Sequence, residues 1–246
     1  MKRFILLIST VICLSIFSYP IYNYESILNP NTSVIPAKSY NVNFTMLPVG
    51  GMGFSTNFSF FPRIMFGLSY SATNIVSYDR PQFSKYPGFL VKVLLVEEED
   101  YVPAVSFGIS SQGFGTFYNN RYYIKSKGFF VNTSKILYPP LGELLICGGA
   151  NYSIFENIDE KMIDFFCQAE YYFTDNFGLL LEYFLGLDDR TDDNSFGRGV
   201  GYFNIGLKWI YEEKLGIEVD FVDILKNNVT ENGVGRSVKI TYSDFF

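Results

Sequence analysis

Apolar and polar residues alternate along most of this chain with a period of two. In the stretch 201–221 the alternation runs through two segments separated only by Glu212, Glu213 and Lys214. The apolar row of the first segment is Phe203, Ile205, Leu207, Trp209 and Tyr211. A period of two is typical of β-strands whose two faces meet different surroundings. The stretch therefore predicts a β-hairpin with one apolar face.

The same pattern recurs from residue 41 to the end of the chain and predicts twelve strands. They fall at about 41–46, 54–60, 64–73, 87–98, 101–113, 121–137, 142–155, 161–174, 177–188, 198–212, 215–224 and 236–246. Two of these ranges, 121–137 and 177–188, are ambiguous because large apolar residues occupy both faces.

The connections between these strands alternate in length. Short turns are expected near Pro62, Glu99, Pro139, Asp175 and Glu213, and longer polar connections at 76–86, 114–120, 156–160, 189–197 and 225–235. Bacterial outer-membrane barrels show this alternation, with short periplasmic turns and longer outer loops. We therefore expect an all-β fold: an antiparallel up-and-down transmembrane β-barrel of about 12 strands, residues 40–246, in contact with outer-membrane lipid and with both termini periplasmic.

The amino-terminal residues have a different character. Lys2 and Arg3 precede an apolar run of about 14 residues, shorter than the roughly 20 that a spanning helix needs, and Ser18 offers a small residue for cleavage. This pattern predicts a cleavable signal peptide over residues 1–18. Residues 19–39 show no periodicity, which predicts an irregular periplasmic lead-in.

Aromatic residues near the strand ends predict interfacial girdles, with sugar stacking as the alternative. They include Tyr70, Tyr122, Tyr123, Tyr171, Tyr183, Trp209 and Tyr211.

Charge and cysteine content narrow the possibilities. The net charge is −6 and the 19 Lys and Arg residues are scattered, so no basic footprint for nucleic acid is present. Beyond the predicted signal peptide the chain has Cys147 and Cys167. Strand alternation places them on opposite faces, and side chains that point apart cannot form a disulfide. We expect two free thiols.

Charged residues on the polar face of the predicted strands are the candidate site. They are Lys92, Asp164, Glu170, Glu182, Lys208, Glu218, Asp220 and Lys239. Such residues would line the lumen, where charge can select solutes. The alternative, which we favour, is that they fill a narrow barrel with ion pairs and hydrogen bonds. A twelve-stranded barrel is compatible with both.

Candidate catalytic chemistry is sparse. The chain contains no histidine, the side chain best suited to proton transfer near neutral pH, so we expect no enzyme activity. The acidic stretch 188–195 has clustered carboxylates that Ca²⁺ could use, but its spacing matches no calcium loop. We expect a solvated outer loop there, and no metal or cofactor.

Several phrases resemble the barrel portion of YjbH-like outer-membrane proteins, which are associated with exopolysaccharide loci. The phrases are PGFLVKVLLVEEEDYVPAVSFGISSQGFG (87–115), RYYIKSKGFF (121–130), GGANYSI (148–154) and GRGVGYFNIGLKW (197–209). The resemblance implies a part in the export or assembly of cell-surface polysaccharide, with polysaccharide or other envelope proteins as partners. The final strand, ending at Phe246, also resembles the terminal aromatic strand that barrel-assembly machinery recognises.

Three functions therefore follow as hypotheses. The first is a non-enzymatic, YjbH-like outer-membrane barrel that assists polysaccharide export. The second is a passive outer-membrane channel for small solutes. The third is a soluble secreted β-protein with an internal ligand cavity.

Overall fold

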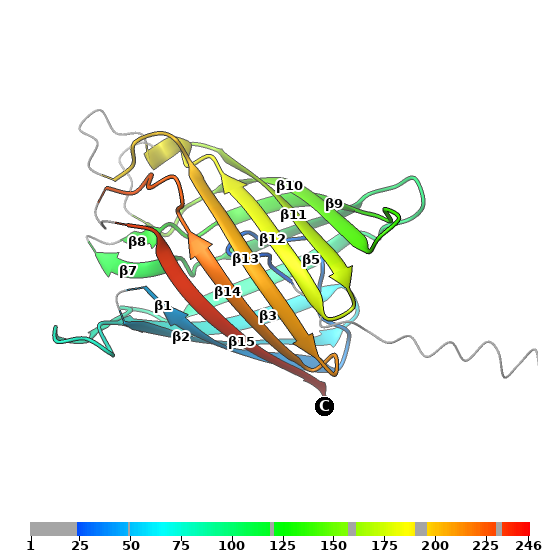
Figure 1. The fold of residues 1–246 in the computed structure, drawn as a ribbon, viewed down its shortest axis with the longest axis horizontal. Coiled ribbons are helices and arrows are strands. Elements are labelled where there is room, and N and C mark those ends of the chain that lie inside the picture. The colour runs from blue at the N-terminus through cyan, green and yellow to red at the C-terminus, as the bar shows by residue number, and fades with distance from the viewer. Residues whose placement is uncertain (1–23, 49, 119–120, 157–160, 190–195, 230–232) are drawn as a thin grey trace, which may run out of the picture.

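Twelve antiparallel strands form a closed barrel in the computed structural model, which describes residues 24–246 except 49, 119–120, 157–160, 190–195 and 230–232 (Figure 1). The barrel strands are β1 (Ser39–Leu47), β2 (Gly51–Phe61), β3 (Ile64–Thr73), β5 (Gly88–Val96), β6 (Ala104–Ser110), β9 (Gly128–Leu137), β10 (Glu143–Tyr152), β11 (Asp164–Thr174), β12 (Phe177–Phe184), β13 (Tyr202–Tyr211), β14 (Leu215–Val222) and β15 (Gly235–Phe245). The predicted barrel and its strand number are confirmed.

The barrel closes between its first and last strands. β1 pairs with β2 on one side and with β15 on the other, with Ser39 opposite both Ser59 and Phe245. Each of the other barrel strands pairs with the barrel strand before it and the one after it along the chain. Closure satisfies backbone groups that an open sheet edge would leave unpaired.

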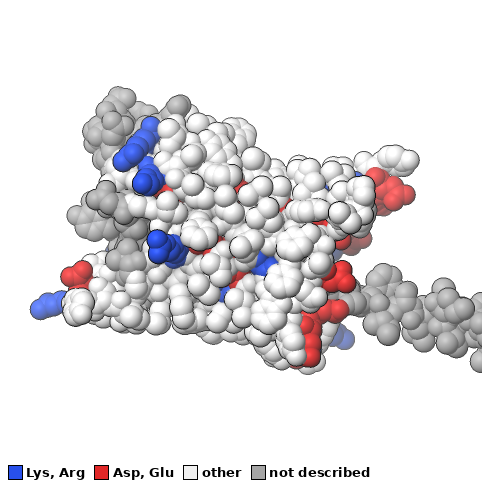
Figure 2. Space-filling view, in the orientation of Figure 1, with Lys and Arg blue, Asp and Glu red and all other residues white. Residues whose placement is uncertain are grey.

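The period-two pattern separates an inner face from an outer face. On β13, Leu207, Trp209 and Tyr211 are exposed, while Lys208 and Ile210 between them are buried. In the space-filling view most of the visible face is uncharged, and most charged side chains gather at the two ends (Figure 2). The apolar rows therefore form the outer surface of the barrel.

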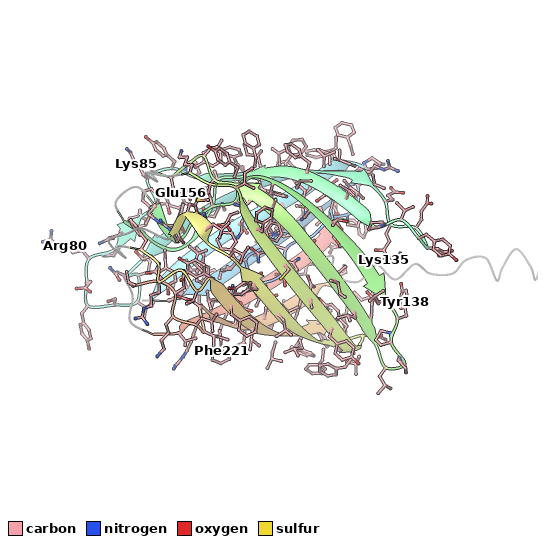
Figure 3. The ribbon with its side chains drawn as sticks, turned by 90° about the horizontal axis from the view of Figure 1, so that it is seen from above. Arg80, Lys85, Lys135, Tyr138, Glu156 and Phe221 are labelled. Atoms are coloured by element: carbon pink, nitrogen blue, oxygen red, sulfur yellow. The ribbon has the colours of Figure 1, made fainter. Side chains whose placement is uncertain are left out.

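The two ends of the barrel differ in their connections. One end carries the turns 62–63, 97–103, 138–142, 175–176 and 212–214, and the backbone N–H of Phe246 donates to the Lys38 carbonyl oxygen there at 2.9 Å. The longer connections 74–87, 111–127, 153–163, 185–201 and 223–234 lie at the other end, together with the short turn 48–50. Arg80 and Lys85 mark the long-loop end, and Lys135 and Tyr138 the short-turn end (Figure 3).

The turn between β13 and β14 uses backbone geometry that glutamate rarely adopts. Glu212 and Glu213 have φ of 49° and 57°, and the N–H of Lys214 donates to the Tyr211 carbonyl at 3.2 Å. Two consecutive positive φ values define a type I′ turn, whose twist matches a β-hairpin. The predicted hairpin of 201–221 is confirmed.

The range 121–137 was wrongly predicted as one strand. Residues Arg121–Ile124 form β8, which pairs with β7 (Phe114–Tyr118) in a separate two-stranded hairpin. β9 begins only at Gly128. All four residues of β8 are buried, which explains the lack of a polar face in this stretch. A second short strand, β4 (Gln82–Phe83), extends the sheet beside β3 in the connection 74–87.

Residues 24–38, which we call the internal segment, lie inside the barrel as far as Ile35 and reach its short-turn end at the exposed Lys38 (Figure 1, dark blue). The prediction of an irregular stretch here is correct, but its placement as a periplasmic lead-in is wrong for these residues. The physical reason is a set of inward carboxylates, amides and ammonium groups that bind its backbone. The predicted signal peptide lies outside the described residues.

Candidate functional site

The eight charged residues expected in the lumen all have buried side chains on barrel strands. Lys92 lies on β5, Asp164 and Glu170 on β11, Glu182 on β12, Lys208 on β13, Glu218 and Asp220 on β14, and Lys239 on β15. Seven of the eight therefore lie on the half of the wall formed by β11 to β15. The residues bind one another, or bind two chain segments that enter the lumen.

Three of these residues form a row across neighbouring strands. The Glu218 carboxylate lies 2.9 Å from the Lys239 ammonium and 3.9 Å from the Lys208 ammonium. Both lysines are directly opposite Glu218 in the strand register. Asp220, two residues along β14, accepts a hydrogen bond from the Ser237 hydroxyl at 2.9 Å. Opposite charges on facing positions stabilise this part of the wall.

Glu182 and Lys92 bind the backbone of the internal segment. The Glu182 carboxylate accepts the N–H groups of Leu28 and Asn29 at 3.0 and 2.9 Å. The Lys92 ammonium, 0% exposed, donates to the carbonyl oxygens of Tyr24 and Asn31 at 2.6 and 3.1 Å. Both charged groups thus obtain the hydrogen bonds that a buried charge requires.

Further polar contacts hold the segment along its length. Asn132 Nδ2 donates to the Pro30 carbonyl at 2.7 Å, and the Thr32 and Ser134 hydroxyls are hydrogen-bonded. Asn31 Nδ2 donates to Glu170 at 3.3 Å. These partners lie on β9 and β11, so the segment contacts both of these strands as well as β5 and β12.

The β7–β8 hairpin and the residues after it fill the long-loop end of the lumen. Arg121 pairs with Asp189 at 2.7 Å, and Lys125 pairs with Asp164 at 3.0 Å and also with Asp188. The acidic pair Asp188 and Asp189 is buried, so the expected solvated loop is wrong for these two residues. Residues 190–195 of the predicted loop lie outside the described part of the chain.

An apolar cluster joins the hairpin to the internal segment. It consists of Ile27, Phe114, Tyr123, Ile124, Phe166, Leu180, Phe184, Tyr202 and Val222. Tyr122 and Tyr123 are both buried, so their expected place in a membrane-facing girdle is wrong. The internal segment and the β7–β8 hairpin with the residues after it, which we call the two inserted segments, therefore meet inside the barrel and pack against β11 to β14.

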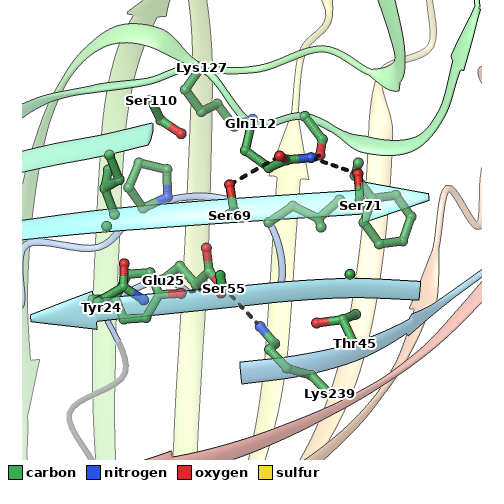
Figure 4. Close-up of a pocket in the computed structure, with 18 of the residues that line it drawn as sticks. Tyr24, Glu25, Thr45, Ser55, Ser69, Ser71, Ser110, Gln112, Lys127 and Lys239 are labelled. Carbon is green, nitrogen blue, oxygen red and sulfur yellow. Dashed lines mark hydrogen bonds and ion pairs between the residues drawn. The ribbon is translucent and has the colours of Figure 1, made fainter. Parts of the chain in front are cut away.

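A cavity of about 170 Å³ remains beside the inserted segments, along β1, β2 and β3 (Figure 4). Its wall includes Thr45, Ser55, Asn57, Ser69, Ser71 and Gln112. Ser69 donates to Gln112 Oε1 at 3.0 Å, and Gln112 Nε2 donates to Ser71 at 3.2 Å. A volume of this size holds on the order of ten water molecules. Hydroxyl and amide side chains thus form the uncharged polar part of a lining that also contains apolar and charged residues.

Two titratable groups in the inserted segments have shifted pKa values. Burial raises the pKa of Tyr24 above its usual range, and the neighbouring Glu25 carboxylate adds to the shift. Burial lowers the pKa of Lys127 to about 8, against the opposing effects of Glu182 and Asp164. Lys127 follows β8 and was absent from the predicted site, because the sequence pattern assigned it to a continuous strand.

Both predicted free thiols are confirmed. Cys147 is buried on the inner face of β10 and Cys167 is exposed on the outer face of β11.

Within the described ranges, no group of three or more Cys, Asp or Glu side chains has the arrangement of a metal site. No helix in the described part of the chain is both long and apolar enough to cross a membrane.

No family model and no curated protein matches the chain. Among solved structures, a KdgM porin aligns with a TM-score of 0.48 and 11% identity over 85% of this chain and 99% of that one. A NanC porin aligns with a TM-score of 0.46 and 12% identity over 84% and 99%. Omp33 of Acinetobacter baumannii aligns with a TM-score of 0.45 and 8% identity over 85% and 97%. These identities and TM-scores are too low to indicate a function. The residues that line the lumen of this chain are the basis for its function instead.

Proposed function

We propose that this chain is a non-enzymatic barrel of the bacterial outer membrane and a passive channel for small polar solutes. The observation that carries the proposal is the cavity that the inserted segments leave along β1 to β3, whose lining includes several hydroxyl and amide groups. On this proposal, solutes pass through that cavity, and the internal segment limits their size.

The outer surface supports the membrane location. Large apolar side chains such as Leu68, Phe107 and Phe221 are exposed around the barrel, and Phe221 points away from the wall (Figure 3). A closed barrel with an apolar outside satisfies every backbone group in lipid, as a bilayer requires. A soluble secreted β-protein would leave this apolar surface in water. Membrane fractionation separates the two: recovery without detergent would favour the soluble protein.

The cavity lining supports small polar solutes. Serine, threonine, asparagine and glutamine side chains can each donate and accept hydrogen bonds, so they replace the water that surrounds a dissolved polar molecule. Gly53 and Gly67 also line the cavity, and neither has a side chain that would occupy it. A Cβ added at Gly67 would lie 2.2 Å from Asn57 Oδ1, so the space there depends on glycine.

The inward carboxylates are hydrogen-bonded or ion-paired within the protein, which supports a role without catalysis. Glu182 binds two backbone N–H groups and Asn204, while Asp164 binds Lys125. These groups stabilise the filling of the lumen, and the chain has no histidine for proton transfer.

The test is single-channel conductance of the purified barrel in planar bilayers. Ser69→Trp places an indole in the cavity, and we expect it to lower conductance at least fivefold. Phe66→Trp on the same strand is the matched control, because alternation turns residue 66 outward. We expect wild-type conductance from this control.

Two outcomes would contradict the channel. One is a wild-type barrel that is folded by circular dichroism but does not conduct. The other is equal conductance in the two tryptophan variants, which would place any current outside the cavity.

A second candidate function is the YjbH-like role in polysaccharide export. It is supported by the phrases quoted above, two of which include Lys92 of β5 and Lys208 of β13 on the inner wall. Its test is the amount of cell-surface polysaccharide after gene deletion. Loss that wild-type protein restores would support this role, and an unchanged amount would contradict it.

A further inference from the structure

Lys127 belongs to the cavity lining and carries a buried ammonium group. The residue is 5% exposed, and its Nζ atom has no hydrogen-bond partner among the described residues. Figure 4 shows Lys127 on the side of the cavity that also holds Ser110 and Gln112. An ammonium group has three donors, so burial without an acceptor is unfavourable.

The backbone around Lys127 is fixed. Asn151 Nδ2 donates to the Lys127 carbonyl oxygen at 3.1 Å. The preceding Ser126 donates its N–H and its hydroxyl to Glu156 at 2.6 and 2.8 Å. These contacts hold the residue at the cavity, so its position is set by the surrounding structure.

The surroundings compensate the charge only in part. The Lys127 Nζ atom lies 3.6 Å from the centre of the Phe184 ring and 5.6 Å from that of Phe166. Aromatic faces attract a cation, but they accept no strong hydrogen bond. The nearby carboxylates of Asp164 and Glu182 are already bound to Lys125 and to the internal segment.

The charges that line the cavity are also unequal. Four lysines and two carboxylic acids belong to its described lining: Lys92, Lys125, Lys127, Lys239, Glu25 and Asp220. Lys239 pairs with Glu25 at 3.5 Å and with Glu218 at 2.9 Å, while Lys125 pairs with Asp164. Lys92 is satisfied by two carbonyl oxygens. Of the four lysines in the described lining, Lys127 is therefore the one whose ammonium group has no hydrogen-bond or ion-pair partner among the described residues.

We propose that the cavity binds small hydroxylated carboxylates, with the carboxylate accepting hydrogen bonds from Lys127. The hydroxyl groups of the solute exchange hydrogen bonds with Ser69, Ser71 and Gln112 across the cavity. A carboxylate supplies both the negative charge and the acceptors that Lys127 lacks. This inference rests on the proposed channel for its biological meaning, because it names the solute class of the same cavity.

The experiment is saturation-transfer NMR on the full barrel in detergent, with glycerate as the probe and glycerol as its uncharged counterpart. We expect saturation transfer to glycerate in the wild type, at least a fivefold loss in Lys127→Gln, and recovery in Lys127→Arg. Lys85→Gln is the matched control, because Lys85 is an exposed lysine at the same end of the barrel. It should bind glycerate as the wild type does.

Two results would overturn the proposal: no transfer to glycerate in the wild type, or equal transfer to glycerate and glycerol. Equal transfer to glycerate in the Lys127→Gln and Lys85→Gln variants would also overturn it. If Lys127→Gln does not fold, comparison of glycerate with glycerol on the wild type still decides the role of charge. Binding is measured without current, so a barrel that binds glycerate but does not conduct refutes the channel and leaves the site. A barrel that conducts but does not bind glycerate refutes the site and leaves the channel.

Discussion

Lys92 holds both arms of the loop that the internal segment forms inside the barrel. Its ammonium binds the carbonyl oxygens of Tyr24 and Asn31, which are seven positions apart in the sequence. The N–H of Asn31 also donates to the Tyr24 carbonyl at 3.3 Å, so the lysine closes the base of the loop. Lys92→Met keeps an unbranched side chain of similar length and removes the charge. We expect this change to loosen the segment and leave the barrel intact.

The size of the effect follows from the two lost hydrogen bonds. A hydrogen bond from a charged donor contributes about 1.5 to 3 kcal/mol. Part of this gain is offset in the wild type, because docking of the segment removes the ammonium from water. We therefore expect Lys92→Met to weaken docking of the segment by about 2 to 3 kcal/mol. It corresponds to an increase of about 30- to 150-fold in the undocked population.

Amide hydrogen exchange measures this population directly. The N–H groups of Leu28 and Asn29 donate to the Glu182 carboxylate and can exchange only when the segment leaves it. We expect their exchange to accelerate about 30- to 150-fold in Lys92→Met, while amides of β13 and β14 keep their wild-type rates. Lys135→Met is the control, because this partly exposed lysine binds Glu98 and the Glu99 carbonyl at a turn.

Unchanged exchange at Leu28 and Asn29 in Lys92→Met would contradict a role of Lys92 in holding the segment. So would equal acceleration across the whole barrel, because it would mean that Lys92 stabilises the barrel as a whole.

Three further predictions concern other parts of the molecule. Glu182→Gln should also accelerate exchange at Leu28 and Asn29, because a neutral amide oxygen accepts these N–H groups more weakly than a carboxylate does; equal rates in the variant and the wild type would contradict this. Replacing Glu212 and Glu213 by Asn and Gly should raise the free energy of unfolding in urea by about 1 kcal/mol, because the type I′ turn then carries residues that adopt positive φ readily; a lower value would show that the glutamate side chains matter more than the backbone. Folding lowers the pKa of Lys127 from 10.5 to about 8. Between these pH values the unfolded chain binds more protons than the folded chain does. The free energy of unfolding therefore rises with pH over this range, by at most about 3 kcal/mol. In Lys127→Met this rise should be smaller by that amount, and an identical pH profile in both proteins would count against the burial of a charged Lys127.

The barrel could be predicted from the order of the amino acids alone. The alternation of Phe203 to Tyr211 with polar and small residues fixed which face of each strand is apolar, because successive side chains of a strand point to opposite sides. The sorting of short and long connections fixed the meander and its two ends. Even the inward placement of Lys92, Glu182 and Lys239 follows from strand parity alone. These features are local or periodic, so they are visible without coordinates.

The filling of the lumen, in contrast, could be seen only in the folded chain. Residues 24–38 have no periodicity, and they are bound through their backbone by side chains distant in sequence, such as Lys92 and Glu182. The β7–β8 hairpin has apolar residues on both faces because protein surrounds it. A strand within a sheet can have the same pattern, so the sequence did not distinguish the two. Backbone groups are the same in every residue, so no sequence pattern marks which carbonyl or N–H a buried charge will bind. The cavity and the ammonium group of Lys127, which has no described partner, therefore could not be predicted from the sequence.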